Sequence, residues 1–154
     1  MNVEAEQAGA APSSGQPRHR GRQAALQMLY QWEVGRVPIA DVRERFWTEA
    51  PVDAPVEDDI RAFAARLADG VAAHVQEIDP IIVEATDHWR LERMHVMDRL
   101  ILRLAVYEFL YEPDTPGKVV INEALELARA FSADDSVRFI NGILDAIRRT
   151  RARE

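Results

Sequence analysis

Residues 96–110 read VMDRLILRLAVYEFL, and this stretch decides the fold. Its apolar side chains are spread around most of a helical circumference: Val96, Met97, Leu100, Ile101, Leu102, Leu104, Val106, Phe109 and Leu110. Because a helix that is apolar on nearly every side has to be covered by other elements, we expect it in the middle of a helical bundle. Asp98 and Arg103 interrupt this surface, and each needs either a partner or an edge that faces water. The partner could come from a protein interface or from an internal ion pair.

Further helices are predicted on both sides of this central one. Apolar residues recur at helical spacing in five other segments: 25–32, 39–46, 60–71, 121–128 and 140–147. Asp79 and Pro80 fit the N-cap and first position of another helix that reaches about Trp89. Ser132 and Asp135 have the spacing of a capping box. No segment alternates with period two, so the sequence predicts an all-α, single-domain bundle of about seven helices.

Length and composition narrow the class of protein. A domain of about 150 residues buries roughly 70% of its unfolded surface. It therefore needs no disulfide bridge or bound metal to stay folded. The chain has no cysteine, which excludes disulfides and cysteine-ligated metal sites. It has no apolar run of about 18 residues, and its first residues include Glu4 and Glu6. We therefore expect no membrane segment and no signal peptide, and a cytoplasmic location.

The two ends of the chain differ in composition from the rest. Residues 1–17 are rich in alanine, glycine, serine, proline and glutamine. Such a segment has too little apolar surface to offset the entropy of becoming ordered, so we expect a disordered tail. Residues 18–148 form the predicted helical domain, and residues 149–154 form a basic C-terminal tail.

Positive charge is concentrated at the start of the predicted domain. The net charge of −7 argues against a general attraction to nucleic acid. Nevertheless Arg18, Arg20 and Arg22 lie together just ahead of Tyr30. Arginines at the N-terminus of a helix can donate hydrogen bonds to phosphates and stack on unpaired bases, and both contacts suit single-stranded RNA. The alternative is a solubilising helix end, although basic charge at a helix N-terminus is unfavourable to the helix itself.

Patterns typical of catalysis are absent from the sequence. It contains no glycine-rich phosphate loop and no nucleophile elbow. His88, Glu92 and His95 include one Glu-x-x-His motif, whereas carboxylate-bridged di-iron bundles need two copies and two further glutamates. We therefore predict no catalytic residue, no metal and no cofactor, and we interpret these three residues as solvated polar side chains.

Three blocks of sequence resemble the NusB family. The first is RGRQAALQMLYQW at 20–32, and the second is DRLILRLAVYE at 98–108. The third is VINEALELA at 120–128, which continues to DDS at 134–136 and FINGILD at 139–145. By the order and spacing of these blocks the chain is identified as a member of that family.

The resemblance implies two helical sub-bundles and an RNA-binding antitermination factor. Family members bind the boxA segment of nascent ribosomal RNA together with NusE, the ribosomal protein of the small subunit, and join the antitermination complex on RNA polymerase. Carried over residue by residue, the resemblance assigns RNA contacts to seven residues: Arg18, Arg20, Arg22, Tyr30, Asp135, Arg138 and Phe139. It assigns the NusE interface to Glu92, Asp98 and Arg99.

Simpler roles stay open for several of these residues. Tyr30 and Phe139 could be core aromatics, and Asp135 could be only a helix cap. Gly142 is expected to allow a close approach between helices. Two other functions also stay open: a protein-only adaptor or homodimer, and a NusB-like domain cut from a ribosomal RNA methyltransferase.

Overall fold

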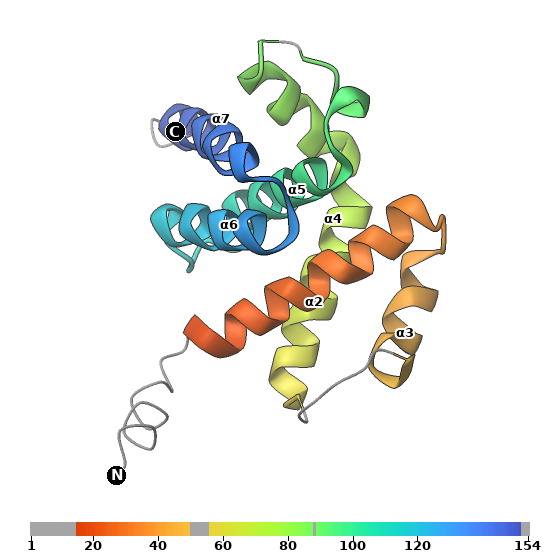
Figure 1. Cartoon of the computed structure of the whole chain (residues 1–154). Coiled ribbons are helices and arrows are strands. Elements are labelled where there is room, and N and C mark those ends of the chain that lie inside the picture. The colour runs from red at the N-terminus through yellow and green to blue at the C-terminus, as the bar shows by residue number, and fades with distance from the viewer. Residues whose placement is uncertain (1–14, 50–55, 88, 152–154) are drawn as a thin grey trace.

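The computed structural model describes residues 15–49, 56–87 and 89–151 (Figure 1). Within these ranges it contains only helices, and no strand. In chain order they are α2 (Gly15–Val34), α3 (Ile39–Glu49), α4 (Asp58–Ala85), the 3₁₀ turn η1 (Leu91–Arg93), α5 (Val96–Tyr111), α6 (Gly117–Phe131) and α7 (Asp134–Arg151). The all-α prediction is confirmed, and the described residues form six α-helices where about seven were expected. None of the described helices is both long enough and apolar enough to span a bilayer.

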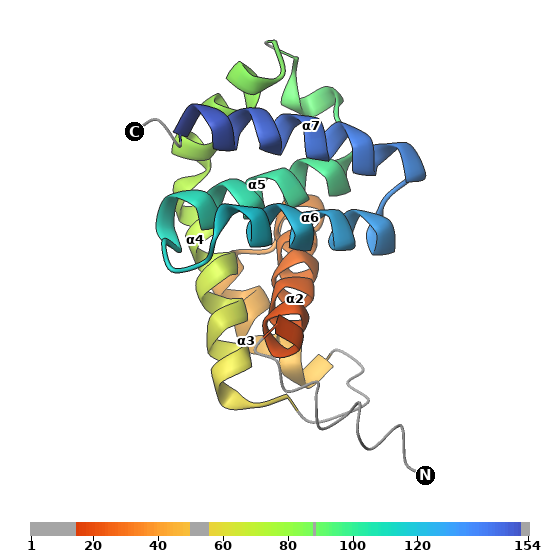
Figure 2. The ribbon, with the colours of Figure 1, turned by 90° about the vertical axis from the view of Figure 1, so that its left-hand side faces the viewer.

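α5 lies in the middle of the molecule, as its apolar circumference predicts (Figure 1). It packs against α2, α4, α6 and α7, and its side chains from Leu100 to Glu108 are all buried. Figure 2 shows α5, α6 and α7 side by side above the part that contains α2 and α3. α4 runs through both parts, so the bundle has the two expected sub-bundles.

The long helix α4 is bent at His74. This residue has non-helical dihedral angles, φ −120° and ψ 18°, and its Nδ1 lies 2.8 Å from the carbonyl oxygen of Gly70. The prediction of a separate helix from Asp79 is wrong, because Pro80 lies inside the second half of α4. Pro80 removes one helical N–H, but the break in the backbone is at His74, six residues earlier.

Arg103 on α5 explains why Asp79 is not a helix cap. The Nε and Nη2 atoms of Arg103 donate to the two carboxylate oxygens of Asp79, each at 2.9 Å. Its Nη1 also donates to Glu33 on α2, at 3.3 Å. Of the alternatives left open for Arg103, the structure therefore shows an internal ion pair.

Asp98, at the start of α5, is also satisfied within the chain. It is only 7% exposed, and its two carboxylate oxygens accept hydrogen bonds from the hydroxyls of Ser132 and Ser136. Ser132 is the C-cap residue of α6, and it directs its hydroxyl at Asp98 instead of forming the predicted capping box with Asp135. These bonds tie the first turn of α7 to α5.

Both terminal helices extend into the predicted tails. α2 begins at Gly15, so residues 15–17 are helical and not disordered. α7 continues to Arg151, so residues 149–151 are helical as well. The rest of the two predicted tails, residues 1–14 and 152–154, lies outside the described residues, as do His88 and residues 50–55.

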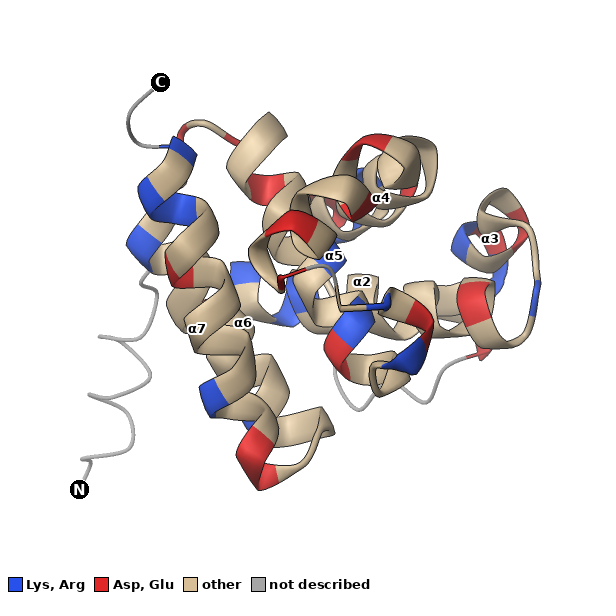
Figure 3. Ribbon diagram, turned by 90° about the horizontal axis from the view of Figure 1, so that it is seen from above, with Lys and Arg blue, Asp and Glu red and all other residues tan. Residues whose placement is uncertain are grey.

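The charge pattern along α7 matches its helix dipole. Figure 3 shows acidic residues in its first turn and basic residues in its last: Asp134 and Asp135, then Arg148, Arg149 and Arg151. Each sign of charge lies at the end of the helix dipole that it stabilises, typically by about 0.3–1 kcal/mol. The arginines at the end of the chain thus have a structural role in α7.

Close packing at a glycine occurs on α4 and not on α7. The expectation for Gly142 is wrong, because a Cβ atom built there would have nothing within 4 Å. A Cβ atom at Gly70 would lie 2.2 Å from the ring of Tyr107 on α5. The glycine that α4 needs for close contact with α5 is therefore Gly70.

We expect Gly70→Ala to lower the free energy of unfolding by at least about 1 kcal/mol, because the added methyl group overpacks against Tyr107. Gly142→Ala is the matched control, and it should raise that free energy by up to about 1 kcal/mol because alanine is the better helix former. Urea unfolding followed by circular dichroism measures both. Equal effects of the two substitutions would contradict the packing at Gly70.

Candidate nucleic-acid interface

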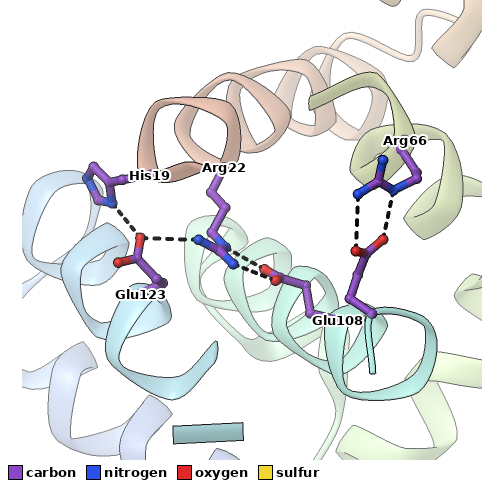
Figure 4. Close-up of polar contacts among 6 residues, drawn as sticks. His19, Arg22, Arg66, Glu108 and Glu123 are labelled. Atoms are coloured by element: carbon purple, nitrogen blue, oxygen red, sulfur yellow. Dashed lines mark hydrogen bonds and ion pairs between the residues drawn. The ribbon is translucent and has the colours of Figure 1, made fainter. Parts of the chain in front are cut away.

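A buried ion pair anchors the start of α2 to the other sub-bundle (Figure 4). Arg22 is 2% exposed, and its Nε and Nη2 donate to the two carboxylate oxygens of Glu108 on α5, both at 2.8 Å. Its Nη1 lies 3.6 Å from Oε1 of Glu123 on α6. Burial acts to lower the pKa of Arg22, but the hydrogen bonds and charge of Glu108 outweigh it and raise that pKa above its ordinary value. Arg22 is thus held, charged, between two helices.

Two more contacts flank this pair in Figure 4. His19 Nδ1 lies 2.7 Å from Oε1 of Glu123. Arg66 on α4 donates to the two carboxylate oxygens of Glu112 at the end of α5, at 2.8 and 3.1 Å. The His19–Glu123 contact holds the first turns of α2 against α6, whereas the Arg66–Glu112 pair joins α4 to the end of α5.

The other two arginines of the predicted RNA-binding cluster stay exposed. Arg20 is exposed and makes no ion pair with any residue of the described ranges. The guanidinium carbon of Arg18 lies 4.4 Å from the centroid of the Phe63 ring, and this side chain too has no acidic partner among the described residues. Both guanidinium groups are therefore available to phosphates.

Arg22 is placed differently from the expectation, because its guanidinium group faces Glu108 and not solvent. The sequence contained a signal for this. Arg22 lies three and four residues before Ala25 and Leu26, so it continues the apolar stripe of α2 toward the N-terminus. A charged residue that lies on the buried face of a helix needs a partner inside the protein. Arg22 is therefore not among the residues that we propose to contact RNA.

A second group of predicted residues forms one exposed face on α7. Asp135, Arg138 and Phe139 are spaced i, i+3 and i+4, so they lie side by side. All three are exposed, and at 38% exposure Phe139 is not a core aromatic. Asp135 and Phe139 line a hollow of about 260 Å³ between α7 and the segment from η1 to α5.

Tyr30 lines a larger hollow of about 650 Å³ among α2, α3, α5 and α6. It is 42% exposed, which excludes a place in the core. Met97 contributes to this hollow, whereas its neighbour Asp98 contributes to the hollow beside α7. The two hollows therefore lie on either side of the first turn of α5.

The three residues predicted to meet a partner protein differ in accessibility. Glu92, in η1, is exposed. Asp98 is buried, and its carboxylate accepts hydrogen bonds from Ser132 and Ser136. Arg99 donates to the carbonyl oxygen of Leu91 at 3.1 Å and to Glu33 at 2.8 Å. Arg99 thus supports the corner between η1 and α5 from inside, Asp98 ties the start of α5 to α7, and Glu92 lies on the surface of the corner.

Comparison with known proteins shows the family of this chain. The profile of the NusB family matches residues 19–149. The chain belongs to the NusB family. Among NusB relatives, the transcription antitermination protein NusB of Koribacter versatilis (strain Ellin345) is 45% identical over 132 residues, which cover 86% of this chain and 88% of that protein.

Solved structures of NusB proteins have the same fold. T. maritima NusB superposes with a TM-score of 0.76 at 35% identity, over 84% of this chain and 89% of that one. The structure of antitermination factors NusB and NusE in complex with dsRNA gives a TM-score of 0.76 at 24% identity, over 87% of this chain and 97% of that one. This second match shows the shared fold.

Arg22→Ala should lower the free energy of unfolding by about 3–5 kcal/mol, because it leaves the carboxylate of Glu108 buried without its partner. Arg20→Ala removes the same charge two residues away, and it should change that free energy by less than about 0.5 kcal/mol because Arg20 is exposed. Chemical unfolding of the two variants gives both numbers. A small effect of Arg22→Ala would show that other contacts hold α2 in place.

Proposed function

We propose that this protein is a transcription antitermination factor that binds single-stranded, boxA-like RNA of nascent ribosomal transcripts. In this proposal it works in the bacterial cytoplasm with NusE, joins the antitermination complex on RNA polymerase, and acts by binding without a catalytic step. The similarity to a transcription antitermination protein over 88% of its length supports this function and does not favour a methyltransferase domain.

The observation that carries the proposal is the exposed pair Arg18 and Arg20 on a helical turn that Arg22 and His19 hold in place. A disordered basic tail would lose conformational entropy on binding RNA, whereas this turn is already ordered. Guanidinium groups can form paired hydrogen bonds with phosphate oxygens. The fixed start of α2 therefore offers two cations in an otherwise acidic chain.

The exposed face of α7 lies close enough to bind the same strand. His19 contacts Glu123 in the middle of α6, and α6 ends eight residues later, at Phe131. At 1.5 Å per residue this is about 12 Å along α6, and α7 begins directly beyond. Arg138 and Phe139 there offer a cation and a ring, so one strand can contact phosphate groups at α2 and bases at α7.

We place the partner protein at the corner between η1 and α5. Glu92 is exposed on η1 and is available to a basic partner. Arg99 holds the carbonyl of Leu91 and so positions η1 from inside. In this proposal Glu92 contacts NusE directly, Arg99 positions the contacting corner, and Asp98 holds the start of α5 against α7.

A salt titration of binding to a boxA-like single strand tests the proposal. The slope of log affinity against log salt is about −0.7 per phosphate contact for single strands. Arg18→Ala/Arg20→Ala should therefore flatten the slope by about 1.4. Arg36→Ala/Arg45→Ala removes the same charge from exposed sites after α2 and on α3, and it should leave the slope unchanged. Purified NusE should tighten binding by the wild type.

Two results would contradict the proposal in different ways. Equal flattening in both variants would assign the salt dependence to net charge and not to contacts at α2. Absence of binding by the wild type, with and without NusE, would favour a protein-only adaptor or homodimer. Sedimentation of the wild type with and without RNA would then show whether self-association covers Arg18 and Arg20.

A further inference from the structure

An exposed tryptophan stands at the hollow between η1 and α7. Trp89, two residues before η1, is 54% exposed, more than any other large apolar side chain among those described. Trp32 and Trp47, in contrast, pack against the core. A tryptophan ring gains much free energy from burial, so one left in water suggests a binding role outside the fold.

The hollow beside this ring measures about 260 Å³. It lies between the segment that carries η1, coloured green in Figure 2, and the first turns of α7. Its polar and aromatic lining comes from both sides: Trp89, Arg93, His95, Asp98, Asp135 and Phe139. The volume is many times the roughly 30 Å³ that one water molecule occupies in the liquid, so the hollow admits a planar ring.

The chemistry of this lining suits a base better than a phosphate. The rings of Trp89 and Phe139 offer faces on which bases stack. The carboxylate of Asp135 repels phosphate but accepts hydrogen bonds from the amino groups of bases. The carboxylate of Asp98 already accepts hydrogen bonds from Ser132 and Ser136. His95 accepts the backbone N–H of Met97 at its Nδ1, so the neutral ring carries its proton on Nε2 and can donate.

We propose that this hollow takes one unpaired base of the bound RNA, stacked on Trp89. The inference rests on the proposed function and adds a base-stacking residue to a site that so far consists of arginines and the face of α7. Phe139 lies on the opposite wall, and Arg93, exposed on η1, is available to the phosphate of the same nucleotide. Arginines at α2 set the salt dependence of binding, whereas stacking on Trp89 adds affinity that salt does not weaken.

The test uses the full chain and a set of boxA-like single strands, each with one abasic position. Trp89→Ala should weaken binding of the intact strand by about 5- to 150-fold with an unchanged salt slope. Trp89→Phe should keep most of the affinity, because it keeps a ring. One abasic position should weaken binding to the wild type by a similar factor and have little further effect on Trp89→Ala. Tyr111→Ala, which removes an exposed ring at the far end of α5, is the control and should bind like the wild type.

The possible failures can be told apart. If the wild type binds RNA and Trp89→Ala binds it equally well, the base site is refuted while the proposed function stands. If Trp89→Ala loses affinity for NusE but not for RNA, the hollow is a protein contact, and the inference is also overturned. If the wild type binds no RNA at all, the proposed function fails and the inference fails with it. Thermal unfolding of Trp89→Ala should match the wild type, since the ring is exposed.

Discussion

The bidentate pair of Arg22 and Glu108 fixes how α2 lies on the rest of the bundle. Both side chains are almost fully buried, and separating them would leave a charge in the interior without its partner, which costs several kcal/mol. The pair forms in only one register of α2 against α5, so the first turns of α2 cannot slide or lift freely. The contact that secures this helix therefore also fixes the turn on which Arg18 and Arg20 are exposed.

Three buried polar side chains of α5 each hold a neighbouring helix through ion pairs or hydrogen bonds. Glu108 holds α2, Arg103 holds the second half of α4 through Asp79, and Asp98 holds the start of α7 through Ser136. Each of these three groups thus fixes a different neighbour and has its own hydrogen-bond partners, whereas Nε of Arg99 on the same helix is buried without one. The two hollows at the start of α5 lie between neighbours positioned in this way, so the surface proposed to bind RNA is built on a rigid frame.

Local patterns in the sequence predict most of the fold but not the long-range pairs that complete it. Apolar periodicity correctly predicts α2, α3, α5, α6 and α7, because each helix buries one stripe or its whole circumference. The signal at Asp79 and Pro80 is misleading, since it is local, whereas the role of Asp79 is decided by Arg103, 24 residues away. Likewise, the motif that predicts an RNA contact for Arg22 carries no information about Glu108, 86 residues later in the chain.

The exposed residues that we propose to bind RNA also differ in how far the sequence predicts them. Arg20 and Phe139 follow from family motifs, and the structure leaves both exposed. Trp89 follows from no motif used above, because its significance lies in its exposure and in the hollow that α7 completes beside it. Whether a side chain is exposed and lies beside a hollow depends on how several helices pack together. The apolar pattern of one segment does not predict either property.

The most direct test of this account is an amide NMR titration of the full, ¹⁵N-labelled chain with a boxA-like single strand. The account predicts that chemical-shift changes gather at residues 18–20, at residues 135–139 and at the indole N–H of Trp89, while the side chain of Arg22 changes little. Changes confined to the opposite end of the bundle, around the groove between Ile81 on α4 and Ile147 on α7, would contradict it.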